Sequence, residues 1–374
     1  MALLLAMHSI YLRLKVTKMN IYNFSPGPSK LPQSVVEKVE KGIKSYNHTG
    51  KSILEISHRS SEFEEILNEI NQNFTILFNL PKNLNILLLQ GGATFQNSFV
   101  PMNISKNASL GCFITGTWGK KTSEDYLKLF RNMKVIDGRN QDLNKYFNKE
   151  SNEFQNIDYL HVTSNETIEG LQVREFNNIN HNKLIIDMSS DFGSYEFIFD
   201  NISYIYAGAQ KNMGIPGVTI CLAKENFLIE TDNPRYLNLK LLAKSNSILN
   251  TPPTISIYVL NLVTKWMIEM GGVDYFQNKS QRQSKEIYDF IDENSSILIS
   301  NVDLNFRSKS NIVFNFKEDH LNEKFVHSAI EKGIIGINGH RSVGGIRVSL
   351  FNSVDDDMFK YFMNFFKNFI NESK

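Results

Sequence analysis

One lysine stands in a setting that suits covalent chemistry. Lys211 follows an apolar run that closes with the small residues Ala207-Gly208-Ala209. A lysine that forms an imine with a carbonyl group must be partly desolvated, and small neighbours leave room for a planar ring to approach its amine. A lysine after a strand is also a common solvated loop residue, so Lys211 alone leaves both interpretations open.

An aspartate upstream gives this lysine a chemical partner. Asp187 ends the apolar run Leu184-Ile185-Ile186, and ligands of parallel sheets lie at the carboxyl ends of strands. Pyridoxal phosphate (PLP) is an electron sink only while its pyridine nitrogen is protonated, and a fixed anion beside that nitrogen keeps the proton there. Asp187 and Lys211 together therefore favour a PLP site, although an aspartate at a strand end also caps helices.

Two glycines indicate where a phosphate could bind. In Gln90-Gly91-Gly92-Ala93-Thr94 an apolar strand gives way to glycines and then to a helix, so backbone N–H groups and the helix dipole become available to an anion. Phe95 stands where a dinucleotide-binding fingerprint would need a third glycine, which makes a nicotinamide cofactor the weaker interpretation. A plain tight turn is the alternative.

An aromatic residue and two basic pairs complete the candidate site. Trp118 follows another strand, where its indole could stack on a cofactor ring or simply fill the core. His58-Arg59 and His340-Arg341 suit a substrate with two anionic groups, because arginine binds carboxylate or phosphate through its planar fork. Each pair, taken alone, could equally form surface salt bridges.

The elements that must position these residues alternate along most of the chain. Short apolar strands and helical stretches alternate from about residue 34 to 270, which predicts a mainly parallel sheet covered by helices. The later residues read as a smaller α+β domain. We expect a large domain over 34–273, a small domain over 274–374, and residues 19–33 packed on the small domain. The predicted strands are Asn85–Leu89, Leu110–Thr115, Tyr159–Thr163, Lys183–Ile186, Ile202–Tyr206 and Gly217–Leu222.

The composition excludes some classes of protein. The 40 basic and 39 acidic side chains nearly cancel, which argues against a nucleic-acid groove or a polybasic membrane surface. The 2 cysteines, Cys112 and Cys221, lie in apolar, strand-like runs and cannot form a disulfide framework. A reducing, cytoplasmic location fits best. Residues 1–18 are Leu-rich and basic without an acid, so they are either an organelle-targeting segment or a loose extension.

Several stretches together resemble the phosphoserine aminotransferase family, within the class V, fold-type I group of PLP enzymes. The resemblance extends over residues 20–374. Its motifs are Asn23-Phe24-Ser25-Pro26-Gly27-Pro28, Ile56-Ser57-His58-Arg59, Gln90-Gly91-Gly92-Ala93, Asn165-Glu166-Thr167-Ile168-Glu169-Gly170, Tyr206-Ala207-Gly208-Ala209-Gln210-Lys211-Asn212, Asn250-Thr251-Pro252-Pro253-Thr254 and Gly339-His340-Arg341-Ser342-Val343-Gly344-Gly345.

The resemblance implies an α/β fold of PLP fold-type I, with a mainly parallel seven-stranded sheet in the large domain and a smaller C-terminal α+β domain. It implies reversible amino transfer from L-glutamate to 3-phosphohydroxypyruvate, giving O-phospho-L-serine and 2-oxoglutarate in serine biosynthesis. PLP is the cofactor that it implies, and no metal ion is expected.

It also implies a role for each candidate residue. Lys211 would hold the cofactor, Asp187 would pair with its pyridine nitrogen, and Trp118 would stack on its ring. The remaining matches are Ala93, Thr94, Thr167 and Gln210 for further cofactor contacts, Asn250 and Thr251 for the cofactor phosphate of a neighbouring subunit in a homodimer, and His58, Arg59, His340 and Arg341 for the substrate anions, with Arg341 as the α-carboxylate clamp.

Three rival interpretations stay open at this point. One is another class V enzyme, such as an alanine–glyoxylate type aminotransferase or a cysteine desulfurase. The strand-like positions of Cys112 and Cys221 count against the desulfurase, which needs an exposed, thiolate-forming cysteine. Another is an inactive scaffold that keeps the fold, and the third is a nicotinamide-dependent enzyme.

Overall fold

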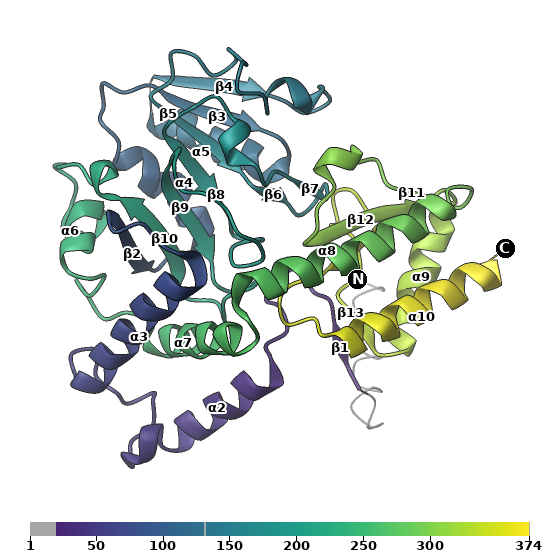
Figure 1. Cartoon of the computed structure of the whole chain (residues 1–374), viewed down its shortest axis with the longest axis horizontal. Coiled ribbons are helices and arrows are strands. Elements are labelled where there is room, and N and C mark those ends of the chain that lie inside the picture. Colours follow the sequence, from purple (N-terminus) through teal and green to yellow (C-terminus); the bar gives the residue numbers. More distant parts are fainter. Residues whose placement is uncertain (1–19, 131, 374) are drawn as a thin grey trace.

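The fold is built around one sheet of seven strands (Figure 1). The computed structural model describes residues 20–130 and 132–373, so the expected extension over residues 1–18 lies outside the described part of the chain. The strand order is β2-β10-β9-β8-β5-β3-β4, and β10 alone runs antiparallel to its two neighbours. The strands are β2 (Leu84–Leu89), β3 (Leu110–Ile114), β4 (Met133–Asp137), β5 (Tyr159–Thr163), β8 (Leu184–Asp187), β9 (Ile202–Gly208) and β10 (Thr219–Lys224).

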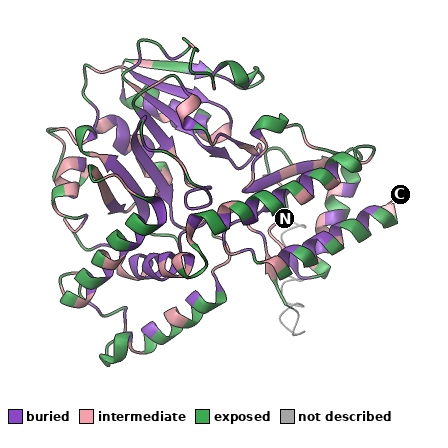
Figure 2. Ribbon diagram, in the orientation of Figure 1, coloured by how far each residue is buried: buried purple, intermediate pink, exposed green. Residues whose placement is uncertain are grey.

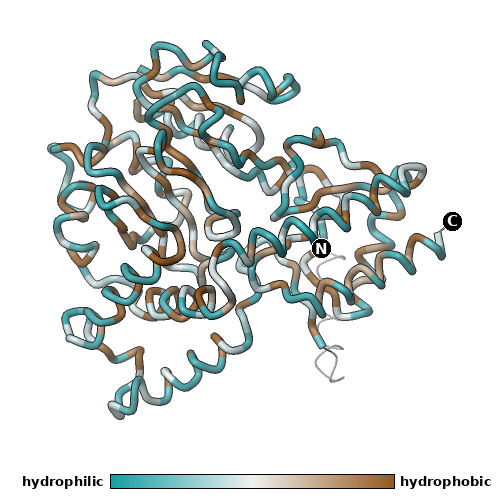
Figure 3. Tube along the Cα trace, in the orientation of Figure 1, coloured by the Kyte–Doolittle hydropathy of each residue, from teal (hydrophilic) through white to brown (hydrophobic). Residues whose placement is uncertain are grey.

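Both faces of this sheet are buried, because alternate side chains of each strand enter two different cores. On one face, Ile185 and Tyr206 pack with side chains of α4 (Gly92–Met102), α5 (Thr117–Leu129) and α6 (Leu239–Lys244). On the other, Ile186 and Ile205 pack with α2 (Gln33–Lys44), α3 (Ser61–Phe78) and α7 (Thr254–Glu269). Figure 2 shows the central strands mostly buried, and Figure 3 shows hydrophobic stretches along them. The predicted α/β fold with a mainly parallel seven-stranded sheet is confirmed.

A second, smaller sheet is formed late in the chain. Helix α8 (Gly272–Glu293) leads to it from the large sheet (Figure 1). It consists of β11 (Leu298–Ile299), β12 (Asn311–Phe316) and β14 (Ile346–Ser349), all antiparallel, and it packs with α9 (Asp319–Glu331) and α10 (Asp356–Ser373). Four phenylalanines of α10, Phe359, Phe362, Phe366 and Phe369, are all buried in this core.

The start of the described chain lies against this smaller sheet. Strand β1 (Tyr22–Asn23) pairs in parallel with β13 (Ile334–Ile335), and the Tyr22 ring stacks on Tyr361 with centroids 4.1 Å apart. The domain boundaries expected from the sequence stay a prediction.

Two short strands, β6 (Asn165–Glu166) and β7 (Leu171–Gln172), form a hairpin that follows β5 at the carboxyl edge of the large sheet. Within residues 20–130 and 132–373, no helix combines the length and the apolar character that crossing a lipid bilayer requires.

Candidate active site

Asp187 and Lys211 lie at the carboxyl ends of neighbouring strands. Asp187 is the last residue of β8 and is the register partner of Tyr206 in β9, the strand that leads to Lys211. The N-terminal segment passes directly over the lysine, because a Cβ atom at Gly27 would lie 3.3 Å from Lys211 Cγ, and Gly27 adopts a φ of +132°. Glycine at this position therefore leaves the lysine stem its space.

The Asp187 carboxylate is held on one side only. Its Oδ1 accepts hydrogen bonds from the Ser189 backbone N–H (2.9 Å) and from the Ser189 hydroxyl (2.6 Å). Burial raises the pKa of Asp187, while the two Ser189 hydrogen bonds and the positive charge of Lys211 oppose that rise. The carboxylate is thus oriented and unneutralised by a close cation, which suits it to hold a proton on a ring nitrogen placed against its other oxygen.

The Lys211 amine is desolvated. Burial lowers the pKa of Lys211, and the nearby carboxylates of Asp187 and Asp191 oppose the shift. Among the described residues no carboxylate lies within 4.0 Å of this amine. A lysine whose pKa is lowered in this way has more of the neutral amine that nucleophilic attack and proton transfer both require.

Two helices begin at the same edge of the sheet, and their N-termini differ. Helix α4 begins after Gly91 with no side-chain cap, and Ala93 and Thr94 lie in its first turn. The N-terminus of α5 is filled, because Glu166 and Glu169 accept hydrogen bonds from its first backbone N–H groups. An uncapped helix N-terminus can bind an anion, because its backbone N–H groups are free and the helix dipole favours negative charge there. The open position for a phosphate is therefore α4.

Trp118 lies in the first turn of α5 and is held by Thr167. Its indole Nε1–H donates to Thr167 Oγ1 at 2.9 Å, and Lys121 Nζ lies 4.5 Å from the centre of its ring. Gln210, next to Lys211, folds back over the backbone, since a Cβ atom at Gly208 would lie 2.6 Å from its Oε1. Trp118, Thr167 and Gln210 thus lie in the segments that follow β3, β5 and β9, at the same edge of the sheet as Asp187 at the end of β8. An amine, an oriented anion, a flat side chain and an open phosphate position fit the parts of PLP.

The structure adds Arg347, which the sequence analysis did not single out. Arg347 lies in β14, and its guanidinium is buried. Its Nη1 donates a long hydrogen bond of 3.4 Å to the Thr167 carbonyl oxygen. Its Nε has no partner among the described residues, and burial lowers the pKa of Arg347. The positive charge of Arg347 is also one of the influences that lower the pKa of Lys211, so the two cations are near one another.

The pair His340-Arg341 lies on a loop next to Arg347. The pKa of His340 is lowered by desolvation and by the charges of Arg347, Lys121 and Arg341, which places these cations around one region. His340 is half-buried and contacts the Ser342 hydroxyl at 2.6 Å, whereas Arg341 is exposed. A cleft of 690 Å³ adjoins this loop, lined among others by Gly344, Glu169 and Arg139, between the edge of the large sheet and the smaller one.

The other four predicted residues do not join this group within one chain. Arg59 is exposed and His58 half-buried in the connection between α2 and α3, which lies at the periphery of the molecule, away from the ends of β8 and β9 (Figure 1). Asn250 and Thr251 are exposed in the loop before α7, where the Thr251 carbonyl oxygen accepts a hydrogen bond from Gln90. All four side chains are therefore available to a second molecule.

Comparison with known proteins agrees with this geometry. The profile of the family described as Aminotransferase class-V matches residues 21–361. A phosphoserine aminotransferase of Bacillus cereus (strain ATCC 10987 / NRS 248) is 38% identical over 363 residues, which cover 95% of this chain and 99% of that relative.

Two solved structures have the same fold along nearly their whole length. The phosphoserine aminotransferase from Bacillus circulans subsp. alkalophilus has a TM-score of 0.87 and 34% identity, and the match covers 95% of this chain and 99% of that one. A PLP-bound phosphoserine aminotransferase from Trichomonas vaginalis has a TM-score of 0.85 and 28% identity, with 93% and 100% covered.

The fold is that of a PLP-type transaminase, and the chain belongs to the class-V aminotransferase family. Within that family it belongs with the phosphoserine aminotransferases.

Proposed function

We propose that this chain uses PLP to catalyse reversible amino transfer from L-glutamate to 3-phosphohydroxypyruvate, forming O-phospho-L-serine and 2-oxoglutarate for serine biosynthesis. The observation that carries the proposal is the desolvated Lys211 amine beside the oriented Asp187 carboxylate, in a chain 38% identical to a phosphoserine aminotransferase. When bound, PLP supplies the electron sink that stabilises negative charge at the substrate α-carbon.

The residues of the chain divide the work of holding the cofactor. Asp187 keeps the ring nitrogen protonated, and the first-turn N–H groups of α4, including those of Ala93 and Thr94, bind the phosphate. Trp118 would lie against the ring face, with Thr167 fixing its indole. Gln210 would contact the cofactor beside Lys211. Lys211 would attach the cofactor and, once freed by the incoming amine, would be the base that takes the proton from the substrate α-carbon and delivers it to the cofactor side of the C–N bond.

Two cationic regions divide the substrate between them. The α-carboxylate must lie close to the α-carbon and hence to Lys211, and the buried Arg347 is the cation near that position. We therefore assign to Arg347 the clamp role that the sequence analysis gave to Arg341. His340 and Arg341, farther out on their loop, are assigned to the distal phosphate or the distal carboxylate of glutamate. Both substrates present a carboxylate and a distal anion, so one site serves both half-reactions.

A homodimer would complete the site. The half-buried His58 and the exposed Arg59 are free to reach the distal anion in a second copy, and Asn250 and Thr251 are free to reach its cofactor phosphate. A paired cation on a surface contributes little by itself, but the same cation enclosed between two chains binds an anion strongly.

Substrate discrimination tests the proposal. Purified protein with PLP is assayed with glutamate and either 3-phosphohydroxypyruvate or hydroxypyruvate. We expect kcat/KM to be about 100-fold or more higher for the phosphorylated acceptor, because its phosphate makes charge-assisted hydrogen bonds to His and Arg side chains. Equal rates with the two acceptors would contradict a phosphate site and favour a class-V aminotransferase for small neutral substrates. No transfer to either acceptor, in protein that binds PLP, would contradict the proposed reaction as a whole.

A further inference from the structure

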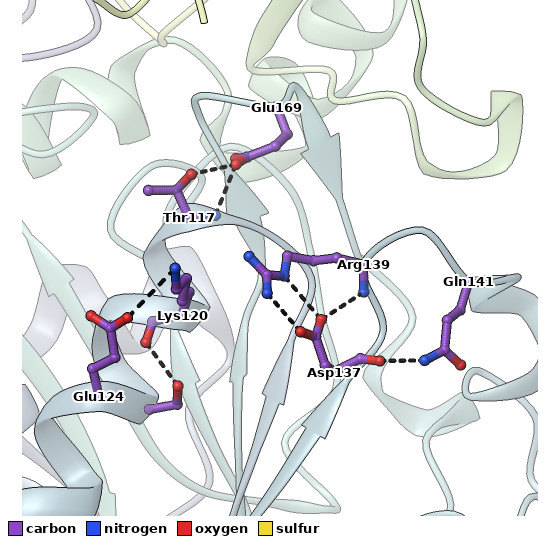
Figure 4. A network of polar contacts seen from close by, with 8 residues as sticks. Thr117, Lys120, Glu124, Asp137, Arg139, Gln141 and Glu169 are labelled. Carbon is purple, nitrogen blue, oxygen red and sulfur yellow. Dashed lines mark hydrogen bonds and ion pairs between the residues drawn. The ribbon is translucent and has the colours of Figure 1, made fainter. Parts of the chain in front are cut away.

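The hairpin between β6 and β7 grips the start of helix α5 with two carboxylates. Glu166 Oε1 accepts from the Gly119 N–H and Oε2 from the Trp118 N–H, both at 2.8 Å. Glu169 Oε1 accepts from the Thr117 N–H at 2.9 Å and from its hydroxyl at 2.5 Å, as Figure 4 shows. Four donors at the start of one helix are thus bound by two side chains of one turn.

The β6–β7 turn can approach the start of α5 closely because Gly116, the residue before this helix, has no side chain. A Cβ atom at Gly116 would lie 2.7 Å from Glu166 Cδ and 2.7 Å from Glu169 Oε2, so any other residue there would push both carboxylates away. Glu166 is fully buried, with an exposed fraction of 0%. A buried carboxyl group that accepts hydrogen bonds from two backbone N–H groups has a fixed orientation, because each of its oxygens is engaged in one of these bonds.

The same turn holds the other end of the tryptophan and reaches the smaller sheet. Thr167 accepts the indole N–H of Trp118 through its hydroxyl, and its carbonyl oxygen accepts from Arg347. Asn165 donates to Asn311 Oδ1 at 2.7 Å, so the turn is also fastened to β12. The turn therefore contacts both the backbone and the ring of Trp118, and on its other side the guanidinium assigned to the substrate.

We propose that Glu166 is a positioning residue of this active site: by binding the backbone of Trp118 and Gly119 it fixes the orientation in which the Trp118 indole meets the cofactor ring. The proposal rests on the proposed function in one respect, the stacking of Trp118 on PLP. Its first consequence, the fixed environment of the indole, holds in the protein without cofactor.

The electrostatics agree with a dedicated role. Burial and the neighbouring Glu169 raise the pKa of Glu166 to about 8, while the N–H groups of Gly119 and Trp118 oppose the rise. A buried carboxyl group is a poor choice for a helix cap if only stability is at stake, because removing it from water is costly. An exposed side chain could cap α5 with less loss, but it could not hold Trp118 rigidly.

The chain offers a direct optical test. It has 2 tryptophans, so Trp266→Phe leaves Trp118 as the sole indole. In that background Glu166→Gln is compared with Glu124→Gln, which makes the same substitution in an exposed side chain of α5. Glutamine keeps the size of glutamate but offers one acceptor where two donors need one each.

We expect the cofactor-free Glu166→Gln protein to show a red-shifted Trp118 emission and about a twofold increase in acrylamide quenching, because the indole loses one of its backbone anchors. PLP titration, followed by quenching of Trp118 emission, should give a dissociation constant about tenfold higher. Glu124→Gln should match the parent in all three measurements. Thr167→Val, which releases the ring end of the same tryptophan, should shift emission in the same direction and supplies the test if Glu166→Gln does not fold.

Emission, quenching and PLP affinity equal to those of Glu124→Gln would overturn the positioning role. A second outcome would separate the two proposals: cofactor-free Glu166→Gln shows the expected red shift and increased acrylamide quenching, but PLP does not quench Trp118 emission in the parent. That result would uphold the role of Glu166 and would count against the stacking of Trp118 on PLP, and so against the proposed function.

Discussion

At the scale of single residues, the site separates two kinds of cation. Arg347 is buried, and its Nε has no partner within the described part of the chain, whereas Arg341 is exposed on its loop. A buried guanidinium without a carboxylate is costly, since its desolvation is not offset by a charge within the protein. A substrate carboxylate would supply that charge. The position of the two arginines therefore predicts different kinetic defects when each is removed.

Arg347→Lys is expected to raise KM for glutamate and for 3-phosphohydroxypyruvate alike, lowering kcat/KM about 100-fold, because both substrates lose the planar two-point contact at their shared α-carboxylate. Arg341→Ala should affect the phosphorylated acceptor more than its unphosphorylated analogue. Steady-state kinetics with the three substrates separate the two patterns, and Arg282→Lys, on an exposed pair with Asp356, is the control. If Arg341→Ala instead weakened all three substrates equally while Arg347→Lys did not, the original assignment of the clamp to Arg341 would stand.

The sequence predicted most of the candidate site from short motifs. Lys211 and Asp187 could be chosen from residue type and from their places after apolar runs. Arg347 could not, since Ile346-Arg347-Val348 alternates like a strand with a charged residue facing solvent, and burial of that residue depends on the loop and hairpin that cover it. The sequence also gave no indication of a positioning role for Glu166, because a glutamate in a polar turn gives no sign that it will be fully buried.

At the scale of elements, the predicted boundaries of the strands buried on both faces differ from the observed ones by at most a few residues. The run Tyr159–Thr163 was predicted as observed, and Leu110–Thr115 ends one residue earlier as β3. Strand β4 (Met133–Asp137) was not predicted. It lies at the edge of the sheet with Lys134 and Val135 exposed, so it lacks the continuous apolar run by which a central strand is recognised.

The cap of α5 predicts an unusual pH dependence of stability. Glu166 has a pKa of about 8 in the folded chain against 4.5 for a solvated glutamate. Its folded-state pKa is raised, so its contribution to stability is present below pH 4.5 and is lost as the pH rises toward 8. Glutamine does not titrate. The unfolding free energy of cofactor-free Glu166→Gln, relative to the parent, should therefore increase between pH 4.5 and 8 by an amount on the order of a few kcal/mol.

Urea unfolding of both proteins at several pH values measures this difference. Glu124→Gln should give a difference that does not change with pH, because its partner Lys120 and the solvent leave that carboxylate exposed. A difference between Glu166→Gln and the parent that is constant from pH 4.5 to 8 would show that Glu166 is ionised throughout. The result would then favour the two backbone N–H groups over burial as the dominant influence on its pKa.

At the scale of the whole molecule, the residues predicted for the site lie in two separate groups within one chain. Lys211, Asp187 and Arg347 meet at the junction of the two sheets, whereas His58, Arg59, Asn250 and Thr251 are on or near the surface elsewhere. No property of a single sequence reports which exposed residues will be covered by another copy, because a loop that completes a partner's site has the same composition as any polar loop. The family resemblance supplied that expectation, and it stays a prediction.

Mixing two inactive chains tests whether the site is shared. Lys211→Ala lacks the amine and Arg59→Ala lacks a distal-anion contact, so each homodimer is expected to be impaired at both of its sites. In a mixed dimer with shared sites, one site combines an intact Lys211 with an intact Arg59, and the other site carries both defects. After co-refolding at equal concentrations, half of the dimers are mixed, and the specific activity should recover to about a quarter of the parent. The control mixture of Lys211→Ala with the double variant should stay inactive. Recovery no greater than the sum of the separate variants would mean that Arg59 serves the site of its own chain or none, and the two-chain site would have to be abandoned.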